Sequence, residues 1–280
     1  MLAVVTGASR GLGRLCARGL AAHGADLLLI ARDEAALAEV AGEIRAECPG
    51  RQVATLGCDL DDAEAPRRVF EAAEQHGLVD VLVNNAAVQG PIGPVWEVPW
   101  REFEATLRFD LLVPVALCRA VLPGMKGRGR GWIINISGGG ATSPRPMFTA
   151  YAAAKTALVR FTETLAIETA GYGIRVNAVS PGAFASNMTT AVHAAAEKAG
   201  AAEAAAAQKL LDRRRYGKRR GSGPACRLFG AGRGPRCHQQ TDQRRLGPVG
   251  LPPSSSRGGR ARRCFHATPN LAAGVKFELG

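Results

Sequence analysis

The sequence has no uninterrupted apolar run close to the roughly 20 residues that a membrane-spanning helix needs, and no basic and apolar leader precedes its first apolar segment. We therefore expect a soluble, cytoplasmic protein without a membrane partner. Its seven cysteines include no C-x-x-C pair. Because Cys16, Cys58 and Cys118 lie within apolar patterns, buried reduced thiols are favoured over disulfides.

Acidic residues are scarce only in the last part of the chain. Residues 1–200 contain 19 Lys+Arg against 20 Asp+Glu, whereas residues 201–280 contain 17 against 4. The net charge of +12 would by itself favour a nucleic-acid partner, but the first two thirds of the chain is nearly neutral. At 280 residues the chain can bury a sizeable core in one large α/β domain or two small ones.

The stretch Thr6 to Gly13, TGASRGLG, follows the apolar run Leu2 to Val5 and leads into a helical pattern that continues to His23. This order predicts a strand, a glycine turn and a helix. The glycines let the backbone bend tightly, approach a ligand closely and pack against the helix. Free N–H groups at the positive helix end favour a phosphate, although a plain tight turn fits the same pattern.

Apolar runs of strand length alternate with helical patterns up to residue 180. This alternation predicts right-handed βαβ crossovers and the α/β class, with a doubly wound, Rossmann-like parallel sheet. Pro123-Gly124 is expected to end the fourth helix. The strands are expected at 2–5, 25–31, 52–58, 79–83, 132–137 and 174–179, and the helices at 12–23, 33–47, 62–76, 100–122 and 151–171.

Tyr151 and Lys155 are four residues apart in a predicted helix, so both side chains lie on one face, one turn from each other. An ammonium beside a phenol favours the phenolate, and the tyrosine can then donate or accept a proton. The same spacing occurs on ordinary helix surfaces. The neighbouring motifs favour the chemical interpretation, because polar residues follow the third and fourth strands where open α/β sheets bind ligands.

Residues 1 to about 195 resemble the short-chain dehydrogenase/reductase family. TGASRGLG matches its cofactor turn, Asp59 its adenine contact, Asn84 to Ala87 its N-N-A-G, and Tyr151 with Lys155 its catalytic pair; Asn177 with Pro181-Gly182 matches the motif beside the nicotinamide. The resemblance implies hydride transfer between a nicotinamide and a carbonyl or secondary alcohol carbon of a small molecule. In that mechanism Tyr151 relays the proton, while Lys155 makes the phenol more acidic and holds the nicotinamide ribose. The implied cofactor contacts are Gly7, Ser9, Arg10, Gly11, Leu12, Gly13, Arg32, Asp59, Leu60, Asn85, Ala86, Lys155, Pro181 and Gly182.

Two arginines bear on the choice of cofactor. Arg10 lies within the glycine turn, and Arg32 follows the second predicted strand, where an Asp normally accepts both ribose hydroxyls. Guanidinium groups suit a 2′-phosphate instead, so NADP(H) is favoured over NAD. The alternative is that Arg32 is an ordinary solvated residue at a helix start.

The sequence departs from the family pattern at the position of the catalytic serine. Gly138 stands thirteen residues before Tyr151, where the family usually has that serine. Ser137 is the predicted third catalytic residue, although one step along a strand turns a side chain to the other face; Ser143 is the alternative. Loss of this hydrogen bond would slow rather than abolish proton transfer, because one such donor contributes on the order of a few kcal/mol.

Two further departures are milder. Asp110 stands where the family generally has a helix-kinking Asn; it can accept a hydrogen bond but lacks the amide donor. Ala87 replaces the final Gly of N-N-A-G.

The predicted domains are a Rossmann-like domain over 1–195 and a poorly ordered segment over 196–280. The latter begins with an alanine-rich helix. From Arg213 the apolar periodicity is lost, and Arg, Gly and Pro predominate. The seventh strand of the family is therefore expected to be lost. Because the composition changes so abruptly, a frameshifted tail is one hypothesis.

Other interpretations are kept open. A catalytically impaired dinucleotide-binding protein is the main alternative, because Gly138 and the missing strand weaken the substrate side. A basic arm could neutralise phosphates, but few aromatics are present for stacking, so nucleic acid is disfavoured. No metal is expected, because Cys226, Cys237, His238 and Cys264 lack the short paired spacings of zinc sites. A homo-oligomer stays open.

Overall fold

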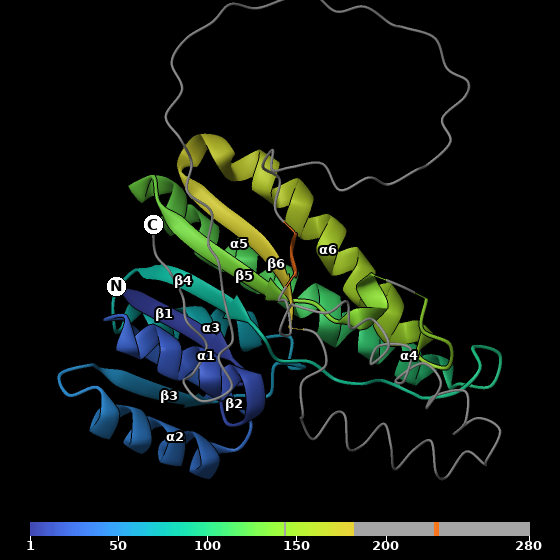
Figure 1. The fold of residues 1–280 in the computed structure, drawn as a ribbon, viewed down its shortest axis with the longest axis horizontal. Helices are drawn as coiled ribbons and strands as arrows, with labels where there is room; N and C mark the ends of the chain where they lie inside the picture. Colours follow the sequence, from blue (N-terminus) through green and yellow to red (C-terminus); the bar gives the residue numbers. More distant parts are fainter. Residues whose placement is uncertain (143, 182–226, 230–280) are drawn as a thin grey trace, which may run out of the picture.

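A computed structural model describes residues 1–142, 144–181 and 227–229, which form one twisted sheet between helices (Figure 1). The strand order is β3-β2-β1-β4-β5-β6-β7, and β1 to β6 are parallel. The doubly wound parallel sheet with six strands is therefore confirmed. The strands are β1 (Leu2–Thr6), β2 (Asp26–Ala31), β3 (Val53–Gly57), β4 (Val79–Asn84), β5 (Gly131–Ile136), β6 (Ile174–Ser180) and β7 (Arg227–Phe229).

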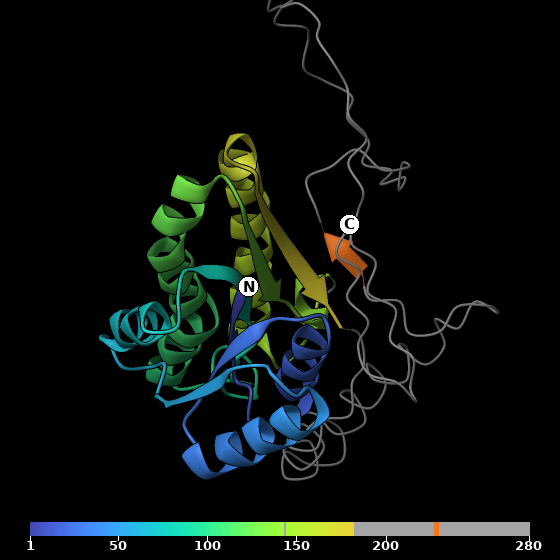
Figure 2. The ribbon, with the colours of Figure 1, turned by 90° about the vertical axis from the view of Figure 1, so that its left-hand side faces the viewer.

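Helices cover the sheet in two layers (Figure 2). One apolar cluster packs the sheet against α1 and α2, and another packs its opposite face against α3, α5 and α6. Because apolar helix stripes are buried on both faces of the sheet, the alternating strands and helices form three layers, with the sheet between two layers of helices. The helices are α1 (Gly11–Ala22), α2 (Glu34–Glu47), α3 (Ala65–Glu74), α4 (Trp100–Leu107), α5 (Val113–Arg128) and α6 (Thr149–Thr169), with short turns η1 (Arg108–Leu112), η2 (Gly139–Ala141) and η3 (Ala170–Tyr172).

A short further strand lies at the edge of the sheet, beside the six parallel strands. The three-residue strand β7 pairs antiparallel with β6, with Ala178 opposite Phe229. An edge strand presents unpaired backbone N–H and C=O groups, so a short extended segment can pair there without any apolar pattern of its own. The other features predicted for 196–280, including the alanine-rich helix and the frameshift, lie outside the described residues.

The long helix predicted over 100–122 is divided in the structure. A π-helical turn, η1, separates α4 from α5, and Pro123 lies inside α5. The prediction that Pro123 ends this helix is wrong. The side chain of Met125 is fully buried just beyond it, and this burial offsets the hydrogen bond that the proline cannot donate. The helix ends instead before Gly129, whose left-handed backbone (φ +66°) caps it.

The carboxyl ends of the parallel strands meet at one edge of the sheet (Figure 1). The glycine turn after β1, the polar residues after β3 and β4, and Gly138 after β5 all lie at this edge. Open parallel sheets bind ligands there, so the fold collects the predicted motifs in one region.

Candidate active site

The glycine turn packs directly against the loop that follows β4. Gly7 has a left-handed backbone (φ +65°), and a Cβ placed on it would lie 2.9 Å from Asn85 Nδ2 and 3.0 Å from Ala86 Cα. A Cβ on Gly13 would overlap the carbonyl oxygen of Gly7. Glycine is therefore needed at both places, because the turn, the helix and the β4 loop approach too closely for side chains.

Hydrogen bonds of Thr6 hold the glycine turn and the loop after β4 together. Its Oγ1 accepts hydrogen bonds from the backbone N–H groups of Asn85 (2.9 Å) and Ala86 (3.0 Å) and donates to the Val83 carbonyl (3.3 Å). The Asn85 side-chain amide donates to the carbonyls of Thr6 (2.9 Å) and Gly7 (3.2 Å). The predicted cofactor residue Asn85 thus uses its amide to hold the turn, which leaves its carbonyl groups for a ligand.

The amino end of α1 is open to an anion as far as its own cap and first turn are concerned. Arg10 is the N-cap residue and makes no side-chain cap, and the first turn contains no acidic residue. Backbone N–H groups at a helix start carry partial positive charge. With Ser9 partly buried and Arg10 exposed beside it, this end can accept a phosphate. Leu12 packs its side chain against the apolar cluster beneath α1, so its backbone is what remains for contact.

Arg32 is exposed just after β2. The two carboxylates that follow it in the sequence make contacts of their own. Asp33 Oδ1 accepts a hydrogen bond from the Ala36 N–H at 3.0 Å and so caps α2. The side chain of Glu34 lies against Gly57, where a Cβ would overlap it. All three residues are exposed to solvent, but Asp33 caps α2 and Glu34 lies against Gly57.

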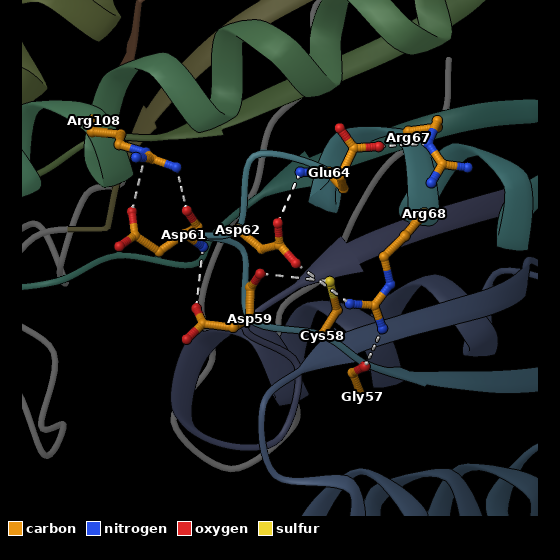
Figure 3. A network of polar contacts seen from close by, with 9 residues as sticks. All are labelled: Gly57, Cys58, Asp59, Asp61, Asp62, Glu64, Arg67, Arg68 and Arg108. Carbon is orange, nitrogen blue, oxygen red and sulfur yellow. Dashed lines mark hydrogen bonds and ion pairs between the residues drawn. The ribbon is translucent and has the colours of Figure 1, made fainter.

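The loop between β3 and α3 is tied to η1 by Arg108 (Figure 3). The Arg108 guanidinium donates to the Asp61 carbonyl and lies 3.4 Å from its carboxylate, measured from Nε to Oδ1. Exposed Asp59 accepts a hydrogen bond from the Asp61 N–H at 3.1 Å, so it shapes this turn at the predicted adenine position. Leu60 is buried in the core, and only its backbone is available for a cofactor.

Tyr151 and Lys155 are both buried in the first turns of α6. The tyrosine is 6% exposed and the lysine 2%, and Lys155 Nζ lies 5.8 Å from the centre of the phenol ring. The ring packs with Phe148 and partly buried Ile92 and Met147. The predicted pair is thus side by side, although one turn of helix alone does not bury it; the apolar cluster does.

Asp110 faces Lys155 from η1. Its Oδ2 lies 3.4 Å from Lys155 Nζ, and its Oδ1 accepts a hydrogen bond from the Val88 N–H at 2.8 Å. Lys155 also donates to the Ile136 carbonyl at 3.4 Å. Burial raises the pKa of the Asp110 carboxyl, while the Lys155 ammonium and the Val88 N–H act in the opposite direction.

Gly138 has no side chain where Tyr151 places its hydroxyl. A Cβ on Gly138 would overlap the Tyr151 oxygen and lie 3.1 Å from its Cζ. Gly138 is extended (φ −156°, ψ 173°), so neighbouring side chains point in opposite directions. Ser137 is buried one residue earlier, and its Oγ has no hydrogen-bond partner within the described ranges. Its catalytic role stays a prediction, and Ser143 lies outside those ranges.

Buried amides behind the site join three elements that sequence reasoning did not connect. Asn84 Nδ2 donates to Asn135 Oδ1 (2.8 Å), and Asn135 Nδ2 donates to Thr162 Oγ1 (2.8 Å). These residues come from β4, β5 and α6, and the chain of bonds fixes α6 against the sheet. Asn135 interrupts an otherwise apolar strand, which was the available sequence indication of a paired polar group.

Arg145 was also missed by sequence reasoning. Its guanidinium stacks 4.0 Å from the centre of the Phe148 ring and lies 5.4 Å from that of Tyr151. Pro181 is partly buried after β6, whereas Gly182 lies outside the described residues. Within the described part of the chain, no helix is long and apolar enough to cross a bilayer, and no three His, Cys, Asp or Glu side chains gather as metal ligands would.

The chain is similar to several known dehydrogenases and oxidoreductases. A curated short chain dehydrogenase of Pseudocercospora fijiensis is 37% identical over 193 residues, which are 66% of this chain and 60% of that protein. A metagenomic short-chain oxidoreductase solved with NADP is 38% identical with a TM-score of 0.62, over 65% of this chain and 82% of that one. NAD⁺-bound xylitol dehydrogenase is 28% identical with a TM-score of 0.64, over 70% and 76%.

This chain spans 60 to 65% of the length of the first three curated relatives that it matches. The family model for short chain dehydrogenases matches residues 1–197, which include the glycine turn, the β4 loop and the Tyr151–Lys155 pair. The chain therefore belongs to the short chain dehydrogenase family.

Proposed function

We propose that this chain is an NADP(H)-dependent oxidoreductase that transfers a hydride between the nicotinamide and a carbonyl or secondary alcohol carbon. The observation that carries the proposal is the buried Tyr151 phenol with Lys155 one turn away, at the same sheet edge as the glycine turn. A phenol beside a cation in a water-poor site is suited to proton transfer at a reacting oxygen.

The residues present fit a dinucleotide. The left-handed glycines Gly7 and Gly11 bring backbone close to any ligand at the turn, and the start of α1 offers uncapped N–H groups to a diphosphate. Asp59 and the backbone of Leu60 would border the adenine, and Ala86 the nicotinamide side. When bound, the cofactor supplies or accepts the hydride.

The chain's own residues handle the proton. In the reducing direction, hydride adds to the carbonyl carbon while the Tyr151 hydroxyl gives its proton to the carbonyl oxygen; oxidation reverses both transfers. Phe148, Ile92 and Met147 keep water from the phenol ring. Lys155 provides the positive charge that favours the phenolate left behind and would hold the nicotinamide ribose.

NADP(H) is proposed over NAD because of the charges after β2 and in the glycine turn. Arg10 and Arg32 are exposed there, while Asp33 is committed to capping α2 and Glu34 packs on Gly57. A ribose 2′-phosphate would therefore meet guanidinium groups rather than a competing carboxylate. Related structures were solved with NADP in one case and NAD⁺ in another, so the proposal of NADP(H) rests on these side chains.

Gly138 favours a second candidate function, a dinucleotide-binding protein with impaired turnover. The position has no hydroxyl for the substrate oxygen, because the Tyr151 hydroxyl lies where a side chain on Gly138 would begin. Loss of one such donor costs on the order of 10²–10³ in kcat. Slow turnover is consistent with the first proposal, whereas complete absence of turnover is expected from the second.

The proposals are separated by NADPH oxidation measured over a panel of ketones and aldehydes, with NADPH binding measured by calorimetry. The oxidoreductase proposal expects turnover that Tyr151→Phe abolishes while NADPH still binds. NADPH binding without turnover of any carbonyl supports the second candidate. Absence of NADPH binding contradicts both.

A further inference from the structure

The Asp110–Lys155 pair is unusual among the ion pairs within the described part of the chain. It is the one pair there in which both side chains are at most 2% exposed; in every other pair at least one partner is substantially more accessible. A buried pair is costly to maintain unless its groups are matched. Its position beside the proton-donating tyrosine suggests that the charge match affects the chemistry.

The two oxygens of the Asp110 carboxylate make different contacts, one structural and one electrostatic. Oδ1 accepts a hydrogen bond from the Val88 N–H at 2.8 Å and so holds the loop after β4. Oδ2 faces Lys155 Nζ at 3.4 Å and makes no hydrogen bond to the rest of the described chain. An asparagine could not supply this negative charge, because its amide is neutral.

We propose that Asp110 is the counter-ion of Lys155 and thereby sets the pH range in which Tyr151 can release its proton. The inference rests on the proposed function. Asp110 acts through Lys155 and is a positioning residue. While the carboxylate balances the ammonium, Lys155 stabilises the phenolate of Tyr151 less than an ammonium without a counter-ion would. Removal of the carboxylate leaves the ammonium free to stabilise the phenolate.

The other charges around Tyr151 do not replace this effect. Arg145, from the loop before α6, lies 5.4 Å from the ring centre, and Lys155, on α6 itself, lies 5.8 Å from it. Both are cations and favour the phenolate in the same direction. Asp110, from η1, is an anion that lies beside Lys155, so substitutions at Asp110 and at Lys155 should shift the ionisation of Tyr151 in opposite directions.

The test is an ultraviolet titration of tyrosinate in the cofactor-free full chain. The sequence contains three tyrosines, so each protein is compared with its own Tyr151→Phe derivative, and the difference isolates Tyr151. In Asp110→Asn we expect this residue to ionise about one to three pH units lower than in the unaltered chain. The pH profile of kcat for NADPH-dependent reduction is expected to shift by a similar amount.

Asp80→Asn is the matched control, because Asp80 is also buried and lies close to two arginines, Arg128 and Arg130, at the opposite end of β4. It should leave the Tyr151 titration unchanged. An unchanged or higher ionisation pH in folded Asp110→Asn would overturn the proposal. The titration needs no turnover, so a shift in a chain that reduces no carbonyl would support the inference while contradicting the proposed function.

A second variant covers failure of Asp110→Asn to fold. Lys155→Met removes the other partner, and the Asp110 carboxyl is then followed by carbon-13 NMR. Since the ammonium lowers the pKa of Asp110, Lys155→Met should raise that pKa further by at least about one unit. An Asp110 titration that does not respond to Lys155→Met also overturns the proposal.

Discussion

The Tyr151 hydroxyl occupies the space in which a side chain on Gly138 would begin. Gly138 therefore does more than remove the serine hydroxyl, because its lack of a side chain leaves room for the phenol. The phenol lies in the volume that a side chain at this position would take, so the two residues are matched to each other. Restoring the family's usual residue is therefore not a simple repair.

The first prediction concerns Gly138→Ser. We expect the new side chain to displace the Tyr151 hydroxyl and to lower kcat about tenfold or more, because a shift of about 1 Å at a reacting group has a large effect on rate. The measurement is steady-state NADPH oxidation together with a crystal structure of the variant. A rise in kcat would show that Tyr151 has room to retreat and would contradict the prediction.

Gly42→Ala provides a matched control for this substitution. Gly42 is exposed in the middle of α2, and a Cβ there would meet nothing within 4 Å. Alanine is favoured over glycine in a helix interior by about 0.5–1 kcal/mol. Thermal unfolding should therefore show a small gain in stability for Gly42→Ala, with kcat unchanged.

The sequence predicted the parts of this molecule that depend on local pattern. The strand β2 reads as a continuous apolar run because it is buried on both faces. The spacing of Tyr151 and Lys155 sets their shared helix face in the same local way. These features are properties of short segments, so neighbouring residues are sufficient to predict them.

Long-range features could not be predicted in this way. The Asn84–Asn135 hydrogen bond depends on the register of β4 and β5, which places these residues opposite each other. The Asp110–Lys155 pair depends on the approach of η1 to α6. α5 continues through Pro123 to Arg128 with Met125 fully buried, and that burial is a tertiary effect which the local pattern does not contain.

The next prediction concerns Arg32→Ala and the cofactor. If Arg32 contacts the 2′-phosphate, its loss should weaken NADPH binding about tenfold, which is about 1.4 kcal/mol, and leave NADH binding nearly unchanged. Calorimetry with both cofactors checks this. Arg51→Ala is the control, because that arginine pairs with Asp26 away from the cofactor edge. Equal weakening of both cofactors would contradict a phosphate contact.

Thr162 and Thr164 form a matched pair on α6. The hydroxyl of buried Thr162 accepts from Asn135 Nδ2 and donates to the Leu158 carbonyl, whereas that of exposed Thr164 donates only to the Arg160 carbonyl. Thr162→Val leaves a buried amide unpaired and should lower the free energy of unfolding by about 1–3 kcal/mol. Thr164→Val should change it by less than about 0.5 kcal/mol. Urea unfolding of both variants measures the difference, and equal effects would contradict the role given to the amide chain.

The final prediction concerns the reactivity of Cys118. Burial raises the pKa of its thiol to about 12, although hydrogen bonds from Asn84 and Asn135 act against this shift. Alkylation requires the thiolate, and a pKa near 12 leaves roughly one thiolate in ten thousand thiols at pH 8, by the tenfold change per pH unit. Peptide mapping after iodoacetamide treatment should therefore find Cys118 unmodified in the folded chain and modified after unfolding. Partly buried Cys48 serves as the internal reference, and labelling of Cys118 as fast as Cys48 at pH 8 would contradict the burial of the Cys118 thiol.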